Sequence, residues 1–217
     1  MLALVTLAGC TTNKQVIPEV SQTTGVVAPI YQRTLYVFGD SLSAGYRLPI
    51  EQSYPNVAEQ MLRDRGYSVR VINAGESWDT SAGLRERLDW VIADAVTGDL
   101  ALVVIGWNDG LQWLSTVQLE DNLTSIVQTL QDRGLSVIVG GMQLPTNLWT
   151  AYRSDFADVY PRVASGTDSA LIPFILTGVG WVPELNLSDG IHPNASGQVI
   201  VAQTVVDFLM SGGLLSK

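Results

Sequence analysis

Ser41, His192 and Asp189 are the side chains of this sequence whose types and spacing best fit acyl-transfer chemistry. A serine hydroxyl is a poor nucleophile until a base accepts its proton during attack. His192 is the only histidine among the 217 residues, so a serine mechanism with an imidazole base must use it. Asp189 lies three residues earlier and could accept a hydrogen bond from the second ring nitrogen, which would fix the tautomer.

Each of these residues also has a structural interpretation. His192 could be a hydrogen-bonded histidine of a capping loop, and Ser41 could be the N-cap of a helix, because it follows an apolar run. The N-cap interpretation is compatible with catalysis, since a helix N-terminus favours negative charge near the serine. Asp40 and Asp109 are expected to be hydrogen-bond partners within their own loops.

The residues that could take part in catalysis lie in four short polar blocks. These are residues 39–46, 73–80, 106–110 and 189–193. The first three follow apolar runs that are predicted to be strands, and the fourth precedes a helical pattern that Asn194 is expected to cap.

Five predicted strands alternate with predicted helices along the chain. The strands are 35–38, 68–72, 100–105, 135–139 and 170–174. The helical patterns lie at 53–66, 84–95, 115–134 and 148–161 and after residue 194. This alternation predicts an α/β fold, a three-layer α/β/α sandwich with a five-stranded parallel sheet. Ligands of such sheets bind beyond the carboxyl ends of the strands, where three of the four blocks would lie.

The four blocks, in this order, resemble those of the SGNH hydrolase superfamily, also called the GDSL esterases and lipases. Residues 39–46 and 189–194 are most similar to its bacterial lysophospholipase/thioesterase/arylesterase branch, and the resemblance covers residues 34 to about 210. It implies a flavodoxin-like fold and no metal or organic cofactor. It also implies that Ser41 is the nucleophile, that His192 is first base and then acid, and that Asp189 orients His192.

The resemblance implies an oxyanion hole with three donors, and one of them departs from the family pattern. The N–H of Ser41 and the side chain of Asn108 match two donors, although Asn108 could instead be a turn residue. The third donor is a backbone N–H at the position of Trp78, where the family has Gly. A positive φ would be costly there for Trp, and the N–H of Gly75 is the alternative donor.

Trp78 and Trp107 are predicted to flank the site and bind substrate. The alternative for both is core packing, because six tryptophans must be accommodated. Aromatic walls would favour an aromatic or acyl group over a sugar.

Composition limits the partners and cofactors of the chain. Its net charge of −9, with 12 basic residues, argues against a nucleic-acid partner. Disulfide, zinc-finger and iron–sulfur scaffolds are excluded by the single cysteine, Cys10. The single histidine excludes a multi-histidine metal site. The length fits one α/β domain of ordinary size.

Residues 1–10 resemble a bacterial lipoprotein signal, because an apolar run ends in Leu-Ala-Gly-Cys. We therefore expect lipidation of Cys10, a flexible tether at 11–32 and the hydrolase domain at 33–217. A location in the bacterial cell envelope follows, with membrane contact through the N-terminal lipid anchor. The alternative is an unstructured N-terminus with a stray cysteine.

The sequence thus predicts a serine hydrolase that cleaves carboxylic esters, including thioesters or lysophospholipids, through an acyl-Ser41 intermediate. One alternative is a carbohydrate or peptidoglycan O-acetylesterase. The other is a non-catalytic envelope lipoprotein in which Trp78 seals Ser41 from solvent.

Overall fold

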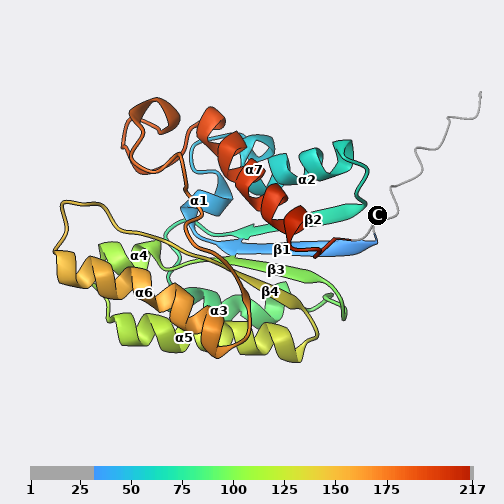
Figure 1. The fold of residues 1–217 in the computed structure, drawn as a ribbon, viewed down its shortest axis with the longest axis horizontal. Helices are drawn as coiled ribbons and strands as arrows, with labels where there is room; N and C mark the ends of the chain where they lie inside the picture. Colours follow the sequence, from blue (N-terminus) through green and yellow to red (C-terminus); the bar gives the residue numbers. More distant parts are fainter. Residues whose placement is uncertain (1–31, 216–217) are drawn as a thin grey trace, which may run out of the picture.

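A five-stranded parallel sheet lies at the centre of the computed structural model, which describes residues 32–215 (Figure 1). The strands are β1 (Arg33–Gly39), β2 (Val69–Gly75), β3 (Leu100–Val104), β4 (Ser136–Gly140) and β5 (Ala170–Ile172). Their order in the sheet is β2-β1-β3-β4-β5, and all four neighbouring pairs are parallel. The predicted fold class is confirmed.

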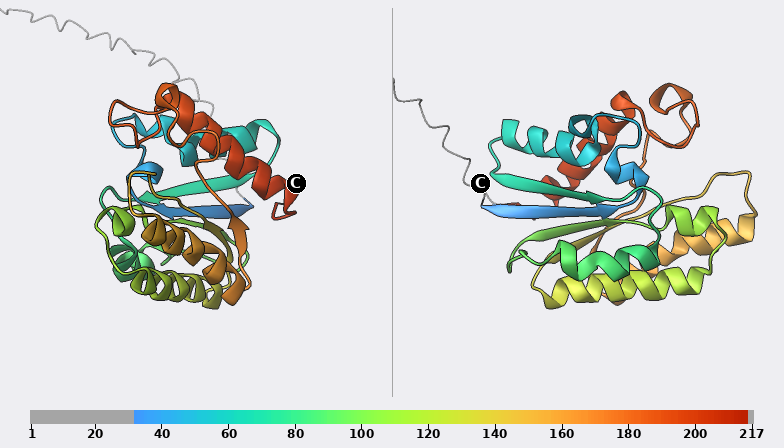
Figure 2. Two further views of the ribbon diagram at one scale, coloured as in Figure 1. Left: turned by 60° about the vertical axis from the view of Figure 1, so that its left-hand side comes forward. Right: turned by 180° about the vertical axis from the view of Figure 1, so that it is seen from behind.

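Helices cover both faces of the sheet (Figures 1 and 2). The helices α2 (Tyr54–Asp64) and α7 (Ala195–Ser211) pack together on one face. The helices α3 (Ser81–Val91), α5 (Thr116–Asp132) and α6 (Thr150–Gly166) lie on the other. Two very short helices, α1 (Ser41–Ala44) and α4 (Trp107–Leu111), follow the ends of β1 and β3. The 3-10 turns are Ile50–Gln52 and Pro183–Leu185.

The strand order explains why the polar blocks meet. From β1 the chain crosses to β2 on one side of the sheet, and the next strand, β3, pairs on the other side of β1. A crevice forms at such a switch point, beyond the carboxyl ends of the two strands. Ser41 follows β1 and Asn108 follows β3, so both lie at this crevice.

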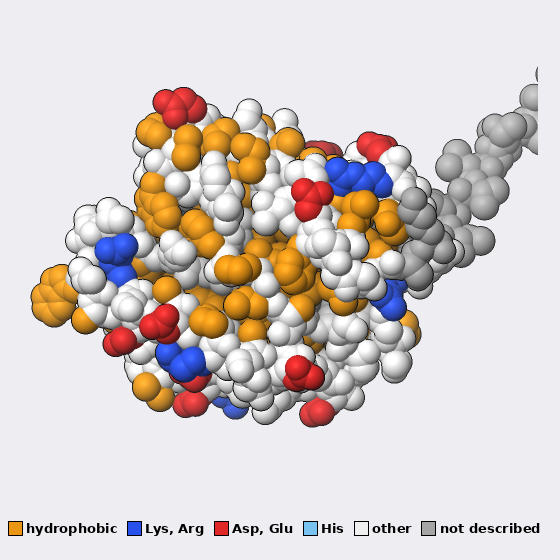
Figure 3. Space-filling model, in the orientation of Figure 1, with side chains coloured by type: hydrophobic (Ala, Val, Ile, Leu, Met, Phe, Trp, Pro, Cys, Tyr) orange, Lys and Arg blue, Asp and Glu red, His pale blue; other side chains and the backbone are white. Residues whose placement is uncertain are grey.

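The centre of the sheet is apolar on both faces. All five residues of β3 are buried, as its uninterrupted apolar run predicts. Figure 3 shows hydrophobic side chains also between the two helical layers on the face drawn in Figure 1, with acidic and basic groups scattered around them.

A glycine lets the turn of α1 approach the sheet closely. A Cβ on Gly75, at the end of β2, would lie 2.4 Å from the backbone nitrogen of Ala44. No side chain fits at that distance, so the segment that carries Ser41 can rest on β2 only because residue 75 is Gly.

Three local predictions need correction. The last strand ends at Ile172 and not at residue 174, because Pro173 has no N–H for the ladder. The helix predicted at 148–161 begins at Thr150 and continues through Pro161 to Gly166. Helix α4 was not predicted, and α1 was considered only through the N-cap interpretation of Ser41, since segments of five and four residues are too short for a helical period.

The predicted cap of α7 is formed, and a serine caps α5. Asn194 caps α7 by accepting hydrogen bonds from the N–H groups of Ser196 and Gly197. The hydroxyl of Ser115 accepts from the N–H of Gln118 at 3.4 Å. The side chain of Gln118 donates to Asn122 and not back to Ser115, so the two residues form no reciprocal capping box.

The predicted signal segment 1–10 with Cys10 lies outside the described residues, as does the tether predicted at 11–32 apart from its last residue. Among residues 32–215, none of the helices combines the length and the apolar character needed to cross a bilayer.

Candidate active site

Ser41, His192 and Asp189 form a continuous hydrogen-bonded line. The Oγ of Ser41 lies 2.8 Å from Nε2 of His192, and Nδ1 of His192 lies 2.9 Å from Oδ2 of Asp189. In the tautomer with the proton on Nδ1, His192 donates to Asp189 and Nε2 can accept the serine proton. The three side chains of the predicted triad are therefore in contact.

Asp189 is held ionised by its surroundings. Burial by itself raises the pKa of the carboxyl. The N–H groups of His192 and Ile191 donate to Oδ1, the imidazole adds a further bond, and the net effect lowers the pKa. Asp189 is thus a stable partner for a histidine that becomes positively charged during the reaction.

The loop that carries His192 is fixed at both ends. Asn186 and Pro193 form an antiparallel bridge across it, and the N–H of Leu187 donates to the carbonyl of His192 at 2.7 Å. The buried amide of Asn186 donates to two carbonyls behind the loop, those of Val179 and Val182. These contacts limit the movement of His192 relative to the sheet.

Tyr46 restrains the imidazole ring directly. The rings of Tyr46 and His192 lie with their centroids 4.4 Å apart and their planes tilted by 34°. The guanidinium of Arg47 lies 5.0 Å from the centroid of the same tyrosine ring, within the range of a cation–π contact. Tyr46 belongs to the first polar block but was not assigned a role from the sequence.

Ser41 is the first residue of α1, not its N-cap. The cap is Asp40, whose Oδ1 accepts a hydrogen bond from the N–H of Leu42 at 3.0 Å. Asp40 is therefore the local hydrogen-bond partner that its position predicts. Because α1 is a single turn, its macrodipole is small, and the N–H of Ser41 itself is the donor that matters near the hydroxyl.

The second oxygen of Asp40 is buried without a hydrogen-bond partner among residues 32–215. Burial raises the pKa of this carboxyl from 3.8 to about 7, against the bond from Leu42, and the nearby carboxylates of Asp79 and Asp109 raise it further. A carboxyl directly before the nucleophile thus changes charge near neutral pH.

The candidate oxyanion donors surround one pocket. Ser41, Trp78 and Asn108 all line it. The backbone N–H groups of Ser41 and Trp78 donate to no other group of the described chain. The amide of Asn108 donates one hydrogen to the carbonyl of Asp79 at 2.7 Å, which leaves its second hydrogen for a ligand. Asn108 lies in α4 and is thus not a turn residue.

Gly75 is not available as the alternative donor. Its N–H donates to the side chain of Asn73 at 3.0 Å, and Asn73 in turn donates to the carbonyl of Ser43. Gly75 therefore serves the close packing of β2 against α1, and the sequence-based alternative is wrong.

Trp78 has a backbone conformation that suits glycine. Its φ is +71°, in the left-handed region. This conformation costs a residue with a side chain about 1–2 kcal/mol. Trp78 thus adopts, with strain, a backbone conformation that Gly adopts freely, as the sequence predicts for a positive φ at this position.

A second buried carboxylate supports residues 76–80, the segment between β2 and α3 that contains Trp78 and is called the donor loop below. Asp109 accepts two hydrogen bonds from Ser81, one from its N–H at 2.9 Å and one from its hydroxyl at 2.5 Å, and Asn122 donates to the same hydroxyl. Burial raises the pKa of Asp109 despite these bonds. Asp109 thus connects α4 with the start of α3. The expectation that it binds within its own loop is wrong, because its partner Ser81 lies 28 residues earlier in the sequence.

The pocket over Ser41 is small and mostly apolar, with a cavity volume of about 30 Å³. Its lining is Ser41, Tyr46, Trp78, Trp107, Asn108, Leu111, Ile191 and His192. Both predicted tryptophans are present, but they differ in burial. Trp107 is 3% exposed and also packs in the core, whereas Trp78 is 73% exposed. Because most of its surface is exposed, the indole of Trp78 makes few contacts with the residues around Ser41 and borders the pocket without filling it.

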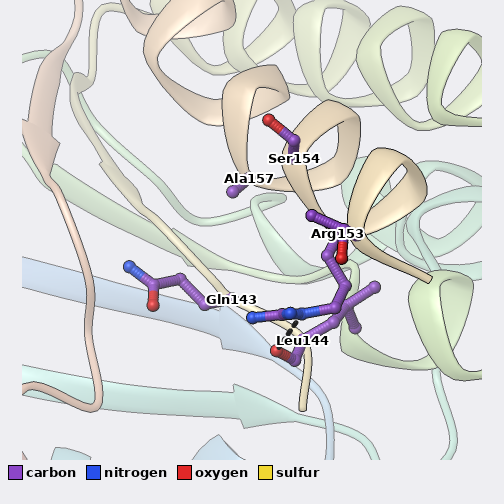
Figure 4. A pocket seen from close by; sticks show the side chains of 6 residues that line it. Gln143, Leu144, Arg153, Ser154 and Ala157 are labelled. Carbon is purple, nitrogen blue, oxygen red and sulfur yellow. Dashed lines mark hydrogen bonds between the residues drawn. The ribbon is translucent and has the colours of Figure 1, made fainter. Parts of the chain in front are cut away.

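A larger hollow of about 220 Å³ lies between α6 and the segment after β4 (Figure 4). Arg153 of α6 points across it and donates to the carbonyl of Leu144. The remaining side chains of its lining are uncharged and include no pair of nucleophile and base. This hollow therefore lacks the features of a catalytic site.

Sequence reasoning missed the pocket residues Tyr46, Leu111 and Ile191. Tyr46 and Ile191 lie inside the recognised blocks, so their position was a usable signal. Leu111 follows the third block directly, and a single leucine has no pattern that separates a pocket wall from a core residue.

Comparisons with known proteins agree with this geometry. The sequence model described as "GDSL-like Lipase/Acylhydrolase family" matches residues 37–200. Esterase TesA of Pseudomonas aeruginosa is 39% identical over 173 residues, which cover 80% of this chain and 86% of that protein. An arylesterase of Vibrio mimicus is 36% identical and is covered to 88%, with 81% of this chain aligned.

A solved structure gives the same result for the fold. The crystal structure of TesA superposes with a TM-score of 0.78 and 38% sequence identity. The match covers 82% of this chain and 99% of that one.

Asp40 makes the stability of the protein depend on pH in a defined window. The unfolded chain loses this proton near pH 3.8 and the folded chain near pH 7, so stability falls as the pH rises between these values. The side chain of Asp40→Asn is always neutral, so the stability of this variant should not show the fall. At pH 8 we expect its free energy of unfolding to be about 2–4 kcal/mol higher than that of the wild type. Urea unfolding of both proteins from pH 4 to pH 8 tests this. If the free energy of unfolding changed with pH in the same way for both proteins, Asp40 would have the same charge in the folded and the unfolded chain, which would contradict the raised pKa.

Proposed function

The chain belongs to the GDSL-like lipase/acylhydrolase family, and we propose that it cleaves carboxylic esters through an acyl intermediate on Ser41. Its relatives are esterases, and the chain is an ester-cleaving serine hydrolase. The observation that carries the assignment to Ser41 is its 2.8 Å contact with Nε2 of His192, itself 2.9 Å from Asp189.

In the first half of the reaction, His192 accepts the proton of Ser41 as the Oγ attacks the ester carbonyl. The imidazolium that forms is stabilised by Asp189, which remains ionised. His192 then gives the proton to the departing alcohol, and the acyl group stays on Ser41.

The negative charge of the tetrahedral intermediate needs donors that are already in place. Ser41, Trp78 and Asn108 line the pocket that Ser41 shares with His192. Their candidate donors, the N–H groups of Ser41 and Trp78 and the second amide hydrogen of Asn108, have no partner in the described chain. Loss of one such donor raises the barrier by about 3 kcal/mol in serine hydrolases. Water activated by His192 then releases the acid and restores Ser41.

The pocket favours esters with a short acyl group and an aromatic alcohol. A cavity of about 30 Å³ has room for a group of a few atoms and cannot enclose a long acyl chain. The indole of Trp78, 73% exposed at its rim, offers a flat face on which an aromatic alcohol can stack. An O-acetylesterase acting on envelope carbohydrate would share the acyl preference but would not need this face.

The cellular location of the protein is a separate part of the proposal. It rests on the apolar run that ends in Cys10, which would carry the lipid anchor and keep the domain at the bacterial envelope. No partner other than the small-molecule or lipid ester is needed for the chemistry.

A fluorophosphonate probe tests the proposed nucleophile, because it reacts with an activated serine and leaves a stable adduct. We expect one adduct per wild-type molecule, none in Ser41→Ala and none in His192→Ala. Ser188→Ala is the matched control, since this exposed serine lies beside Asp189 and should not affect labelling. Mass spectrometry gives the stoichiometry. Equal labelling of Ser41→Ala would place the reactive serine elsewhere.

A panel of esters tests the proposed substrate class. We expect the wild type to favour p-nitrophenyl acetate over the octanoate in kcat/KM. The Trp78→Gly variant should lose about fivefold on phenyl acetate through the lost stacking, and less than about twofold on ethyl acetate. Acetylated xylan and peptidoglycan complete the panel. A clear preference for these glycans, or an equal loss on both small acetates, would contradict the aromatic-alcohol proposal.

A further inference from the structure

Arg87 links three segments that converge on the active site. From the middle of α3, its Nε donates to Oδ2 of Asp79 at 2.8 Å and one terminal nitrogen donates to the carbonyl of Ala74 at 2.8 Å. The same nitrogen makes a longer contact of 3.4 Å with the carbonyl of Gly39. The guanidinium therefore contacts the donor loop and the ends of β2 and β1, and the β1 end directly precedes the nucleophile turn.

The ion pair is well placed to resist movement. Only 7% of the Asp79 side chain and 24% of the Arg87 side chain is exposed. Removing water from such a pair strengthens the attraction and makes it costly to leave either partner alone. The four ion pairs between arginines and carboxylates on residues 32–215 include no other carboxylate as buried as Asp79.

Asp79 is the junction between two of the three oxyanion donors. Its carbonyl accepts the hydrogen bond that orients the amide of Asn108. Its backbone nitrogen follows Trp78 directly, so any movement of Asp79 also turns the peptide units around the Trp78 N–H. The ion pair at this carboxylate therefore restrains the segment next to both donors.

The turn that contains Trp78 is closed by one hydrogen bond, from the N–H of Asp79 to the carbonyl of Glu76 at 3.2 Å, and Trp78 itself is strained. Its φ of +71° is unfavourable for a residue with a side chain, and its indole is mostly exposed, so little apolar burial holds it there. Where the family has Gly the conformation has no such strain. In this chain the force that retains the left-handed conformation must come from neighbouring residues.

We propose that Arg87 is a positioning residue for the oxyanion hole: its ion pair with Asp79 holds Trp78 in the strained conformation that presents its N–H to the pocket. The inference rests on the proposed function, in which that N–H is a donor. Arg87 does not touch the substrate, and it acts through Asp79.

A double-mutant cycle tests this coupling, with Arg87→Ala made in the wild type and in Trp78→Gly. Ethyl acetate is the substrate, because it makes little use of the indole. In the wild-type background we expect kcat to fall about tenfold with KM changed less than about twofold, as the strain of Trp78 drives the loop out of position. In the Trp78→Gly background, where the conformation is unstrained, the fall should be less than about threefold.

Further variants separate positioning from general stability. Arg87→Lys keeps the charge but cannot contact Asp79 and two carbonyls together, so its kcat should lie between those of the wild type and Arg87→Ala. Arg133→Ala is the matched control. It breaks an exposed ion pair between Arg133, which follows α5, and Asp89 of α3, and it should leave kcat unchanged. If Arg87→Ala does not fold, Asp79→Asn replaces it in the cycle, because it breaks the same ion pair and retains the backbone carbonyl.

The outcomes are distinct. An equal loss of kcat in both backgrounds overturns the role of Arg87, even if the wild type hydrolyses ester and Ser41→Ala does not. If Ser41→Ala retains the wild-type kcat, the proposed function itself is wrong, whatever the result of the double-mutant cycle.

Discussion

The hydrogen bond between Ser41 and His192 joins residues 151 positions apart, and the rest of the site depends on it. The sheet brings the serine to the switch point, but the imidazole reaches it from the loop before α7. Gln198, buried on α7, connects the two sides: it accepts from the N–H of Tyr54 and donates to the carbonyl of Leu42 beside the nucleophile. Docking of the last helix on α2 and α1 therefore assembles the catalytic geometry, and the site cannot form before the C-terminal segment has folded.

The sequence allowed prediction of the features that follow from regular patterns. Apolar runs such as Leu100–Val104 identify buried strands, and polar blocks after parallel strands must meet at one edge of the sheet. It did not allow prediction of features set by a single contact. Whether Asp40 or Ser41 caps α1 depends on one hydrogen bond, and whether the N–H of Gly75 is free depends on the rotamer of Asn73. Such choices leave no periodic signal.

Unfavourable features lie close to the nucleophile. Trp78 has a left-handed backbone, and an oxygen of Asp40 is buried without a partner on the described part of the chain. Each costs folding free energy that the surrounding packing must offset. At Trp78 the left-handed backbone coincides with an exposed indole at the wall of the pocket. Arg87 and Asp79 connect this loop to the sheet.

The most direct test of the account is a crystal structure of the phosphonate adduct, because its phosphorus mimics the tetrahedral carbon of the intermediate. We expect phosphorus bonded to the Oγ of Ser41. We also expect one phosphonyl oxygen about 2.7–3.1 Å from the backbone nitrogens of Ser41 and Trp78 and the side-chain nitrogen of Asn108. An adduct on Ser41 whose oxygen points to solvent, or an adduct on another serine, would contradict it.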